Sequence, residues 1–283
     1  MDLFAQRAAL DAHLRSLGRL LVAYSGGVDS AFLAFAAHEV LGDGMLAVLA
    51  DSPSLARTQL QDAVAFAQEQ RIPLEVIETS ELSRPDYARN DSARCFYCKD
   101  ELFTAMEELR RARGFERVAY GVNRDDLSDF RPGQKAAAEH GVAAPLLEAG
   151  LTKADVRALA RGAGLRVWDK PASPCLSSRI AYGLPVTPQA LSAIERGEEA
   201  LAALGFRKLR VRHHGDLVRI EIAPDELPRA LSPAMAAEFT RIFKELGFTF
   251  VTLDLEGFRS GSLNALLPAA ALTRVAPASR RQR

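Results

Sequence analysis

The first residues suited to chemistry lie at positions 25–30, with the sequence SGGVDS. They follow the apolar run LLVAY directly and precede an apolar pattern that is typical of a helix. Gly26 and Gly27 leave backbone N–H groups open to close approach by an anion. The positive end of the following helix points at the same place. Two glycines alone would suit an ordinary tight turn, but the whole string predicts a phosphate-binding turn.

The polar residues of this turn refine that prediction. Ser25 and Ser30 supply hydroxyl donors, whereas Asp29 would repel a phosphate unless it holds Mg²⁺ or a helix N-terminal N–H. The turn is not one of the commoner nucleotide loops. The chain contains no G-x-x-x-x-G-K-[ST], and the G-x-G at Gly42 and Gly44 precedes a strand instead of following one.

The chain has three cysteines, Cys95 and Cys98 in RCFYC and Cys175 in KPASPCLSSR. Three is too few and an odd number for a disulfide framework. A Cys-x-x-Cys serves as a redox pair, as half a zinc site or in an iron–sulfur site, and no histidine has a useful spacing for zinc. Three thiolates fit either a [4Fe–4S] cluster with one open iron or a catalytic thiol beside a pair. Three unrelated buried cysteines are the alternative.

Cys175 has the more reactive surroundings of the three. It follows Pro174 in a loop of small residues, with Lys170 and Arg179 close in sequence. Neighbouring cations favour the thiolate form of a cysteine. The alternative is that both are solvated surface charges.

A second candidate loop, GVNRDDLSDFRPG, follows the fourth predicted core strand. In a doubly wound sheet that position is the ligand edge, beside the first loop. Its amide and carboxylates suit ribose or Mg²⁺, and its second arginine suits phosphate, although an Asp-rich loop is often only a helix cap. The candidate nucleotide-binding residues are Gly121, Asn123, Asp125, Asp126 and Arg131.

The elements that must position these loops alternate along the first two-thirds of the chain. Apolar runs are separated by helical patterns, which predicts an α/β fold with a doubly wound parallel sheet covered on both faces. The expected strands are 21–25, 45–50, 73–78 and 117–121, and the expected helices lie near 29–41, 54–70 and 99–113.

The pattern changes after Tyr182. Thr187 and Pro188 predict a helix start, and Gly215-Asp216 predicts a hairpin between KLRVRHH and LVRIEI, followed by two short helices and the strand FTFVTLDLE. We therefore expect a larger α/β domain over 1–185 that carries the glycine loop, a smaller C-terminal α+β domain over 186–265 and a basic tail over 266–283. Thr152 and Asp155 predict a capping box for a helix that ends near Gly164.

Composition limits the class of partner. The 36 basic and 36 acidic side chains balance, which argues against broad binding of nucleic acid. No apolar run is as long as a membrane span, and the N-terminus predicts an amphipathic helix without the features of a secretory signal. We therefore expect a cytoplasmic protein.

The SGGVDS string resembles the pyrophosphate loop of the ATP pyrophosphatases, the adenine-nucleotide α-hydrolase-like group that includes GMP synthetase and tRNA thiolases. The resemblance implies that ATP is split into AMP and pyrophosphate, so that a carbonyl or carboxylate oxygen is adenylated and a nucleophile then displaces AMP. A glutaminase domain that would bring ammonia is not recognisable in the chain.

Five motifs in order, SGGVDS, RCFYCK, GVNRDDLSDFRPG, KPASPCLSSRI and TLDLEGFRSGSLN, resemble the LarE family over nearly the whole chain. That family makes the nickel-pincer cofactor of lactate racemase. It converts carboxylates of pyridinium-3,5-biscarboxylic acid mononucleotide into thiocarboxylates with ATP. One branch sacrifices the sulfur of a single cysteine, which matches Cys175. The other branch binds a [4Fe–4S] cluster with three cysteines, and this chain resembles that branch.

The resemblance assigns roles to residues named above. It implies Cys175, Asp29 and Arg179 as catalytic residues, Cys95, Cys98 and Cys175 as cluster ligands, and ATP with Mg²⁺ as cofactors. It further implies a sulfide or persulfide donor and a homo-oligomer. Near the substrate phosphate or a subunit interface it places Glu199, Arg210, Arg212, Glu221 and Asp254. By themselves, Arg210 and Arg212 are alternating residues of one strand face, where solvated side chains are the commoner case.

Two other functions fit parts of the pattern. A tRNA thiolase also combines a pyrophosphate loop with three cysteines, but those enzymes usually have lysine where this chain has Val28. The chain also has no recognisable RNA-binding module. An adenine-nucleotide sensor without catalysis would require the cysteines to be incidental.

Overall fold

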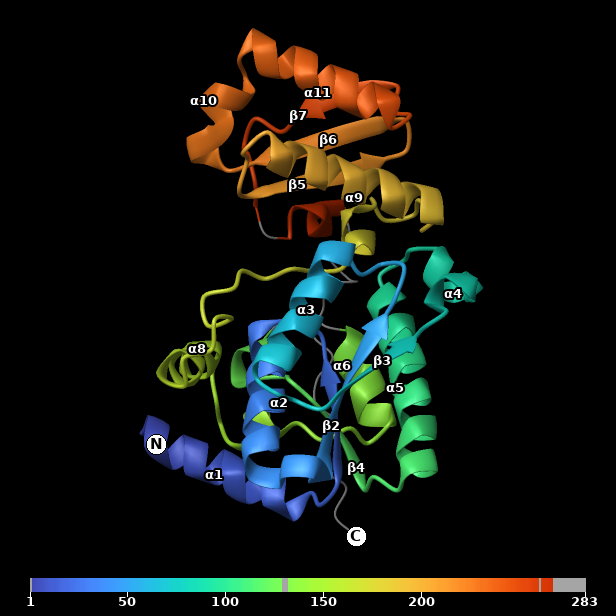
Figure 1. Ribbon diagram of the computed structural model, residues 1–283. Helices are drawn as coiled ribbons and strands as arrows, with labels where there is room; N and C mark the ends of the chain where they lie inside the picture. Colours follow the sequence, from blue (N-terminus) through green and yellow to red (C-terminus); the bar gives the residue numbers. More distant parts are fainter. Residues whose placement is uncertain (1, 129–131, 260, 267–283) are drawn as a thin grey trace.

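The computed structural model describes residues 2–128, 132–259 and 261–266. The first part of the chain forms a four-stranded parallel sheet in the order β3-β2-β1-β4 (Figure 1). Its strands are β1 (Leu20–Tyr24), β2 (Met45–Asp51), β3 (Leu74–Glu78) and β4 (Arg117–Tyr120). The predicted α/β class and all four predicted strands are confirmed.

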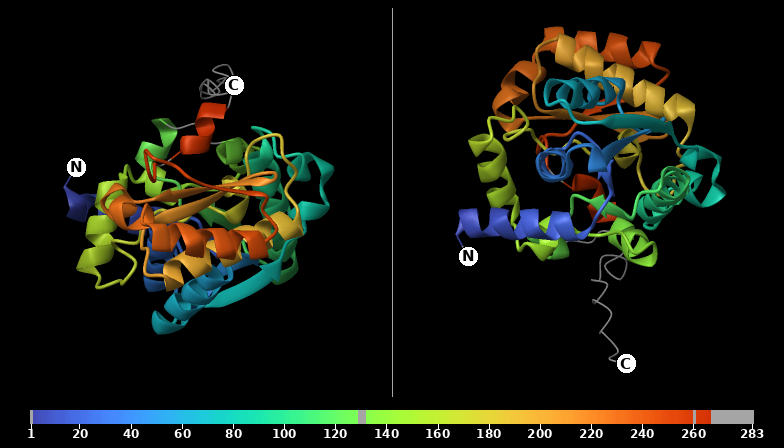
Figure 2. Two further views of the ribbon diagram at one scale, coloured as in Figure 1. Left: turned by 90° about the horizontal axis from the view of Figure 1, so that it is seen from above. Right: turned by 60° about the horizontal axis from the view of Figure 1, so that its bottom comes forward.

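Helices surround this sheet on both faces (Figure 2). They are α1 (Leu3–Ser16), α2 (Val28–Leu41), α3 (Arg57–Glu69), α4 (Pro85–Ala88), α5 (Arg94–Arg113), α6 (Pro132–Glu139), α7 (Pro145–Glu148) and α8 (Lys153–Gly162). The predicted capping box of Thr152 and Asp155 is present at the start of α8. None of the helices in the described ranges is long and apolar enough to cross a membrane.

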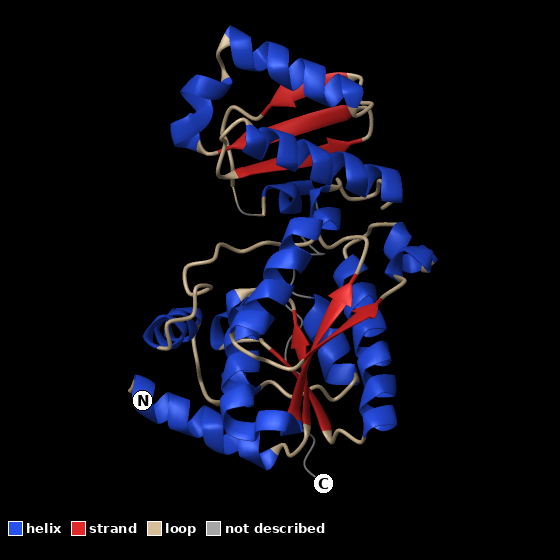
Figure 3. Ribbon diagram, viewed as in Figure 1, coloured by secondary structure: helices blue, strands red, loops and turns tan. Residues whose placement is uncertain are grey.

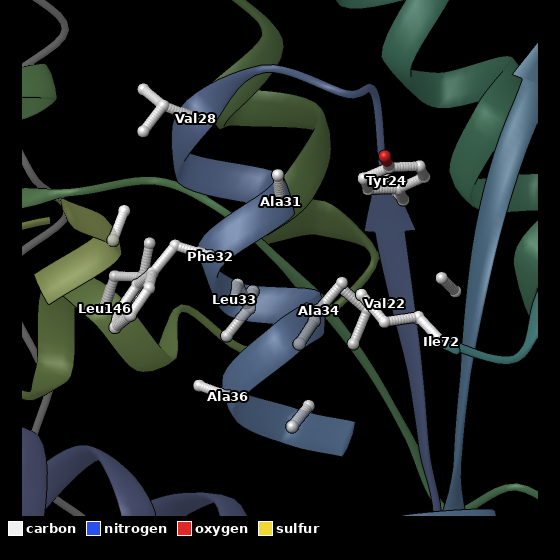
Figure 4. Close-up of a cluster of buried hydrophobic side chains, with 14 of the residues drawn as sticks. Val22, Tyr24, Val28, Ala31, Phe32, Leu33, Ala34, Ala36, Ile72 and Leu146 are labelled. Atoms are coloured by element: carbon white, nitrogen blue, oxygen red, sulfur yellow. The ribbon is translucent and has the colours of Figure 1, made fainter. Parts of the chain in front are cut away.

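Strand β1 is buried on both faces because its side chains alternate between two cores. Leu20, Val22 and Tyr24 pack with α2 and its neighbours, as the close-up in Figure 4 shows for Val22 and Tyr24. Leu21 and Ala23 pack on the other face, in a core that α5 and α6 complete. The apolar run of β1 thus reflects a strand that is covered on both faces, as expected for a doubly wound sheet.

Helix α5 begins earlier than the sequence indicated. We expected it near residue 99, but it starts at Arg94, so that Cys95 and Cys98 lie in its first turn. The Asp91 carboxylate accepts a hydrogen bond from the Ala93 N–H (2.8 Å), which helps to start the helix there. A spacing of three residues then puts both cysteines on one side of α5.

The second part of the chain forms a separate three-stranded sheet in the order β5-β6-β7. Strands β5 (Leu209–His214) and β6 (Leu217–Ile222) form the predicted antiparallel hairpin, and β7 (Phe250–Leu253) pairs with β6 in parallel. Helices α9 (Pro188–Ala203), α10 (Leu227–Ala230) and α11 (Pro233–Glu245) accompany them, and Thr187 caps α9 as predicted. In Figure 3 the strands of the first sheet point toward this second sheet.

One hydrophobic cluster joins the two parts. Tyr87 of α4 and Leu176 and Ile180 of the connecting segment are buried together with residues of α9, β5 and β6. Cys98 packs against this cluster. The carboxyl edge of the first sheet is therefore covered by the second part of the chain, and the cysteines lie at that seam.

Candidate active site

The strand order creates a switch point beside β1. The chain runs from β1 to β2 and β3 on one side, and then returns to place β4 on the other side of β1. The glycine loop follows β1 and the second loop follows β4, so both lie at the carboxyl edge where open α/β sheets bind ligands. The sequence placed both loops correctly.

The two loops approach each other closely at Gly121. A Cβ atom there would lie 2.7 Å from the Ser30 nitrogen and 2.9 Å from the Asp29 carbonyl carbon. Only glycine lets the end of β4 lie against the start of α2 at this distance. The structure thus gives Gly121, which the sequence proposed as a nucleotide contact, a packing role beside the loop.

We expect Gly121→Ala to lower the free energy of unfolding by about 1–3 kcal/mol, the range of an overpacked site, and to weaken ATP binding. The clash is with backbone, which cannot rotate away. Gly162→Ala in α8 is the matched control, because an added Cβ there meets nothing within 4 Å. Denaturant unfolding and ATP titration of both variants would measure this, and a Gly121→Ala protein that matches the control would contradict it.

Hydrogen bonds within the glycine loop fix its shape. The Ser25 N–H donates to Ser30 Oγ (3.1 Å), and Ser30 Oγ donates to the Gly27 carbonyl (3.1 Å). Gly26 has a φ of +70° and no room for a side chain, because a Cβ would lie 2.6 Å from that of Ala63. The loop therefore presents backbone rather than side chains at the N-terminus of α2, which suits an anion.

Asp29 lies in the first turn of α2 and is held by two side chains from other elements. Its carboxylate pairs with the Lys153 ammonium at the start of α8 and accepts a hydrogen bond from Asn123 Nδ2 (3.1 Å). Sequence reasoning missed Lys153, which lies 124 positions away. Asp29 and Asn123, both predicted site residues, are thus brought together.

The two aspartates of the second loop bind backbone. Asp125 accepts from the Lys153 N–H (2.9 Å) and Asp126 from the Asn123 N–H (3.1 Å). These bonds fit the alternative interpretation of an Asp-rich loop as a structural cap. Arg131, the predicted phosphate contact, lies outside the described residues.

Lys170 supports the glycine loop and not the thiol of Cys175. Its ammonium donates to the Gly26 carbonyl (3.0 Å) and pairs with Asp62. Asp62 also pairs with Arg166 (2.5 Å), and these two cations hold the pKa of Asp62 below its usual value against the effect of burial. The expectation that Lys170 favours the Cys175 thiolate is therefore wrong, because the ammonium is used elsewhere.

The three cysteines come together although Cys175 is far from the pair in sequence. Burial raises the pKa of Cys98 to about 12, and the charges of Cys175 and Cys95 contribute. Cys95 as a whole residue is exposed, but desolvation of its thiol also raises its pKa, and the charge of Cys175 adds to the effect. Within the described ranges no three His, Cys, Asp or Glu side chains are close enough to hold one metal ion.

The loop of Cys175 is fastened to the same edge of the first sheet. The Leu176 N–H donates to the Ser54 carbonyl (2.7 Å), in the segment after β2. Cys175 Sγ lies 3.0 Å from Ser177 Oγ. The glycine loop and the thiols therefore share one edge of the sheet.

Arg179 holds the Cys175 loop in place through backbone carbonyls of that loop. Its guanidinium, 2% exposed, binds the Pro174 and Cys175 carbonyls and pairs with Glu198 of α9 (3.0 Å). The alternative that Arg179 is a solvated surface charge is wrong. Its contacts in the described chain hold the loop in place.

Arg94 is a buried cation that the sequence did not single out. It is 4% exposed and donates to the Ser177 carbonyl (2.8 Å) and to Asn90 Oδ1. Burial alone would lower the pKa of Arg94, but the charges of Cys175 and Cys95 outweigh it and the pKa is raised. Its position directly before Cys95 was the available signal.

Glu81 is a second buried charge near the thiols that the sequence gave no reason to select. It is 1% exposed and accepts hydrogen bonds from Ser54 Oγ (2.9 Å), Thr79 Oγ1 (2.9 Å) and Ser52 Oγ. Its charge contributes to the raised pKa of Cys98. Three hydroxyl donors thus keep this carboxylate inside the seam.

The C-terminal residues named earlier divide into two groups. Arg212 and Glu221 form a buried ion pair (2.8 Å), so the expectation of a solvated Arg212 is wrong. Arg210 donates to the Ala172 carbonyl (3.2 Å), and burial with the charge of Arg179 lowers its pKa to about 10.

The remaining two C-terminal residues face other neighbours. Asp254 pairs with Arg219 (3.7 Å) and Arg259 (3.5 Å), away from the described contacts of the thiol loop. Glu199 is exposed, and the glutamate that reaches the site is its neighbour Glu198.

The four-stranded parallel sheet and the two loops at its carboxyl edge are consistent with an α/β domain of the PP-loop class. No family model matches the chain. Over 119 residues, 39% of this chain and 22% of the relative, it is 29% identical to the glutamine-hydrolysing GMP synthase of Brucella melitensis biotype 1. That similarity agrees with the class and covers only a part of each protein.

Longer similarities identify the family. The chain is 36% identical over 271 residues to the pyridinium-3,5-bisthiocarboxylic acid mononucleotide synthase of Lactiplantibacillus plantarum, covering 95% of this chain and 98% of that enzyme. It is 44% identical over 251 residues to an uncharacterized protein of Synechocystis sp., covering 89% and 94%. The chain belongs to the LarE family, as its motifs predicted.

Proposed function

We propose that this protein is an ATP-dependent sulfur transferase of nickel-pincer cofactor biosynthesis. Its substrate would be pyridinium-3,5-biscarboxylic acid mononucleotide, whose carboxylate it converts into a thiocarboxylate. Membership of a family that contains a bisthiocarboxylic acid mononucleotide synthase supports this. The observation that carries the proposal is that the glycine loop and the three thiols lie at the same edge of the first sheet. The segment around Cys175 connects them, because Lys170 donates to the Gly26 carbonyl and the Leu176 N–H donates to the Ser54 carbonyl.

In the first step a substrate carboxylate attacks the α-phosphorus of ATP, and pyrophosphate leaves. The glycine loop at the N-terminus of α2 offers backbone N–H groups to the departing pyrophosphate. Asp29 and Lys153 form an ion pair at the same helix end, which suits them to bind Mg²⁺ and phosphate oxygens respectively once ATP enters. Asn123 keeps the Asp29 carboxylate in position.

In the second step sulfur attacks the adenylated carbon, and AMP leaves with the original oxygen. Cys95, Cys98 and Cys175 would hold a [4Fe–4S] cluster, which when bound supplies sulfide at an iron that has no protein thiolate. Arg179 and Glu198 keep the Cys175 loop in place. The hydrophobic seam between the two sheets excludes water from the adenylate, which water would otherwise hydrolyse.

The products of ATP test this assignment. We expect incubation with ATP, Mg²⁺ and the pyridinium substrate to release AMP and pyrophosphate in equal amounts, because the glycine loop is of the pyrophosphate-binding type. Anion-exchange chromatography of the nucleotides and a pyrophosphate assay measure both products. Release of ADP and phosphate would contradict the proposal.

A further inference from the structure

A buried arginine lies beside Cys95 and the Cys175 loop without a carboxylate partner in the described chain. Arg94 stands in the first turn of α5, directly before Cys95. None of the ion pairs found among the described residues includes Arg94, although its guanidinium is buried. A buried charge is costly unless it is paired. By contrast, Arg179 and Arg212, the other buried arginines at the seam, each pair with a glutamate.

The groups around Arg94 are thiols and phenols rather than carboxylates. Those that act on its guanidinium belong to Cys175, Cys95, Tyr182 and Tyr87. The guanidinium lies 5.7 Å from the centre of the Tyr182 ring. An anion bound at the thiol site would therefore give this cation the partner that it lacks in the described chain.

Arg94 also ties two distant segments together. Its Nη1 donates to the Ser177 carbonyl, two residues after Cys175, and to the Asn90 side chain. Asn90 is fully buried and donates in turn to the Ala181 and Leu184 carbonyls (2.9 Å each). The start of α5, with Cys95 and Cys98, is thereby held against the Cys175 loop by hydrogen bonds that cross more than 80 positions of sequence.

We propose that Arg94 is a positioning residue of the sulfur site. Its guanidinium fixes the Cys95 end of α5 against the Cys175 loop and would offer a permanent positive charge to the cysteine thiolates and to the sulfide of a cluster bound by them. The role of the positive charge rests on the proposed sulfur transfer. The role of Arg94 in positioning the thiols does not depend on a bound cluster or substrate. The two parts are separated by experiment.

The first measurement needs no cluster. Phenylarsine oxide binds two thiols only when they are close together, and its capture by the reduced protein can be followed by mass spectrometry. In a Cys98→Ala background, where capture requires Cys95 and Cys175, we expect Arg94→Gln to bind it at least tenfold more weakly than the same protein with Arg94, and Arg94→Lys to lie between the two. Arg89→Gln is the matched control, since Arg89 is an exposed arginine of the same segment, paired with Asp86 and Asp91. Capture by both Arg94 variants equal to that of the wild type would overturn the inference.

The second measurement separates charge from scaffolding. After anaerobic reconstitution with iron and sulfide, the reduction potential of the bound cluster should be more negative in Arg94→Gln, because a positive charge is lost, and unchanged in Arg94→Lys. If Arg94 has only a structural role, Arg94→Gln would bind less iron, but the protein that does bind a cluster would show an unchanged reduction potential. That result would overturn the proposed role of the positive charge.

The outcomes also distinguish this inference from the proposed function. If the wild type captures the arsenical but binds no iron, the proposed cluster is wrong. The positioning role of Arg94 is then decided by the capture measurements alone. If Arg94→Gln does not fold, Arg94→Lys decides. For Arg94→Lys, which keeps the positive charge, weaker capture of the arsenical with an unchanged cluster potential supports the inference. Capture by Arg94→Lys equal to that of the wild type overturns it.

Discussion

Replacing any one of the three cysteines with alanine should stop thiocarboxylate formation, with a loss on the order of 10³-fold, because residues that act as a unit fail together. The charge of Cys175 contributes to the raised pKa of Cys95 and of Cys98, although the three cysteines come from two segments. Each alanine variant should be about as inactive as the others. The measurement is the rate of thiocarboxylate formation by mass spectrometry under anaerobic conditions.

The control is the first half-reaction. All three variants should still form AMP and pyrophosphate, since the glycine loop and the Asp29 pair lie on other elements. Iron content after reconstitution should fall in each variant. Full activity of Cys95→Ala and Cys98→Ala beside an inactive Cys175→Ala would contradict a shared cluster.

Asp29→Ala should reduce ATP cleavage by about 10²–10³-fold, which is the usual effect of losing one preorganised electrostatic group at a reacting centre. The substitution removes the partner of Lys153 and the acceptor of Asn123 together, so both residues lose their fixed positions. Nucleotide products measured at saturating ATP would test this.

Asp43→Ala is the matched control for Asp29→Ala. Asp43 is an exposed aspartate between α2 and β2, at the opposite end of the sheet, and its loss should leave ATP cleavage unchanged. An Asp29→Ala protein that cleaves ATP as fast as this control would remove Asp29 from the mechanism. Retained folding of both variants is checked by thermal unfolding.

The parts of the fold that follow from local pattern could be predicted from the sequence. Strand β1 and the glycine loop are adjacent in the chain, and the hairpin of β5 and β6 is defined by its own turn. The start of α5 could not be placed, because RCFYCK is short and shows no helical period before Lys99. The contacts that fix it there, from Asn90 and Arg94 to the Cys175 loop, join distant segments.

The site was predicted where the residue type itself is informative. Cysteine is rare in this chain, so three of them attract attention, and the glycine string is unusual. Lysine, arginine and glutamate are common, and nothing local distinguishes Lys153, Arg94 or Glu198 from residues on the surface. Their importance comes from burial and from partners 19 to 124 positions away, which only the folded chain reveals.

The most direct test of the account is one anaerobic reaction followed to completion. Protein reconstituted with iron and sulfide is incubated with ATP, Mg²⁺, excess sulfide and pyridinium-3,5-biscarboxylic acid mononucleotide, and both product and protein are weighed by mass spectrometry. The account predicts several thiocarboxylates per protein chain, an equal amount of AMP for each, and a Cys175 of unchanged mass. A single turnover that leaves Cys175 lighter by the mass of hydrogen sulfide would contradict it and show that the protein gives up its own sulfur.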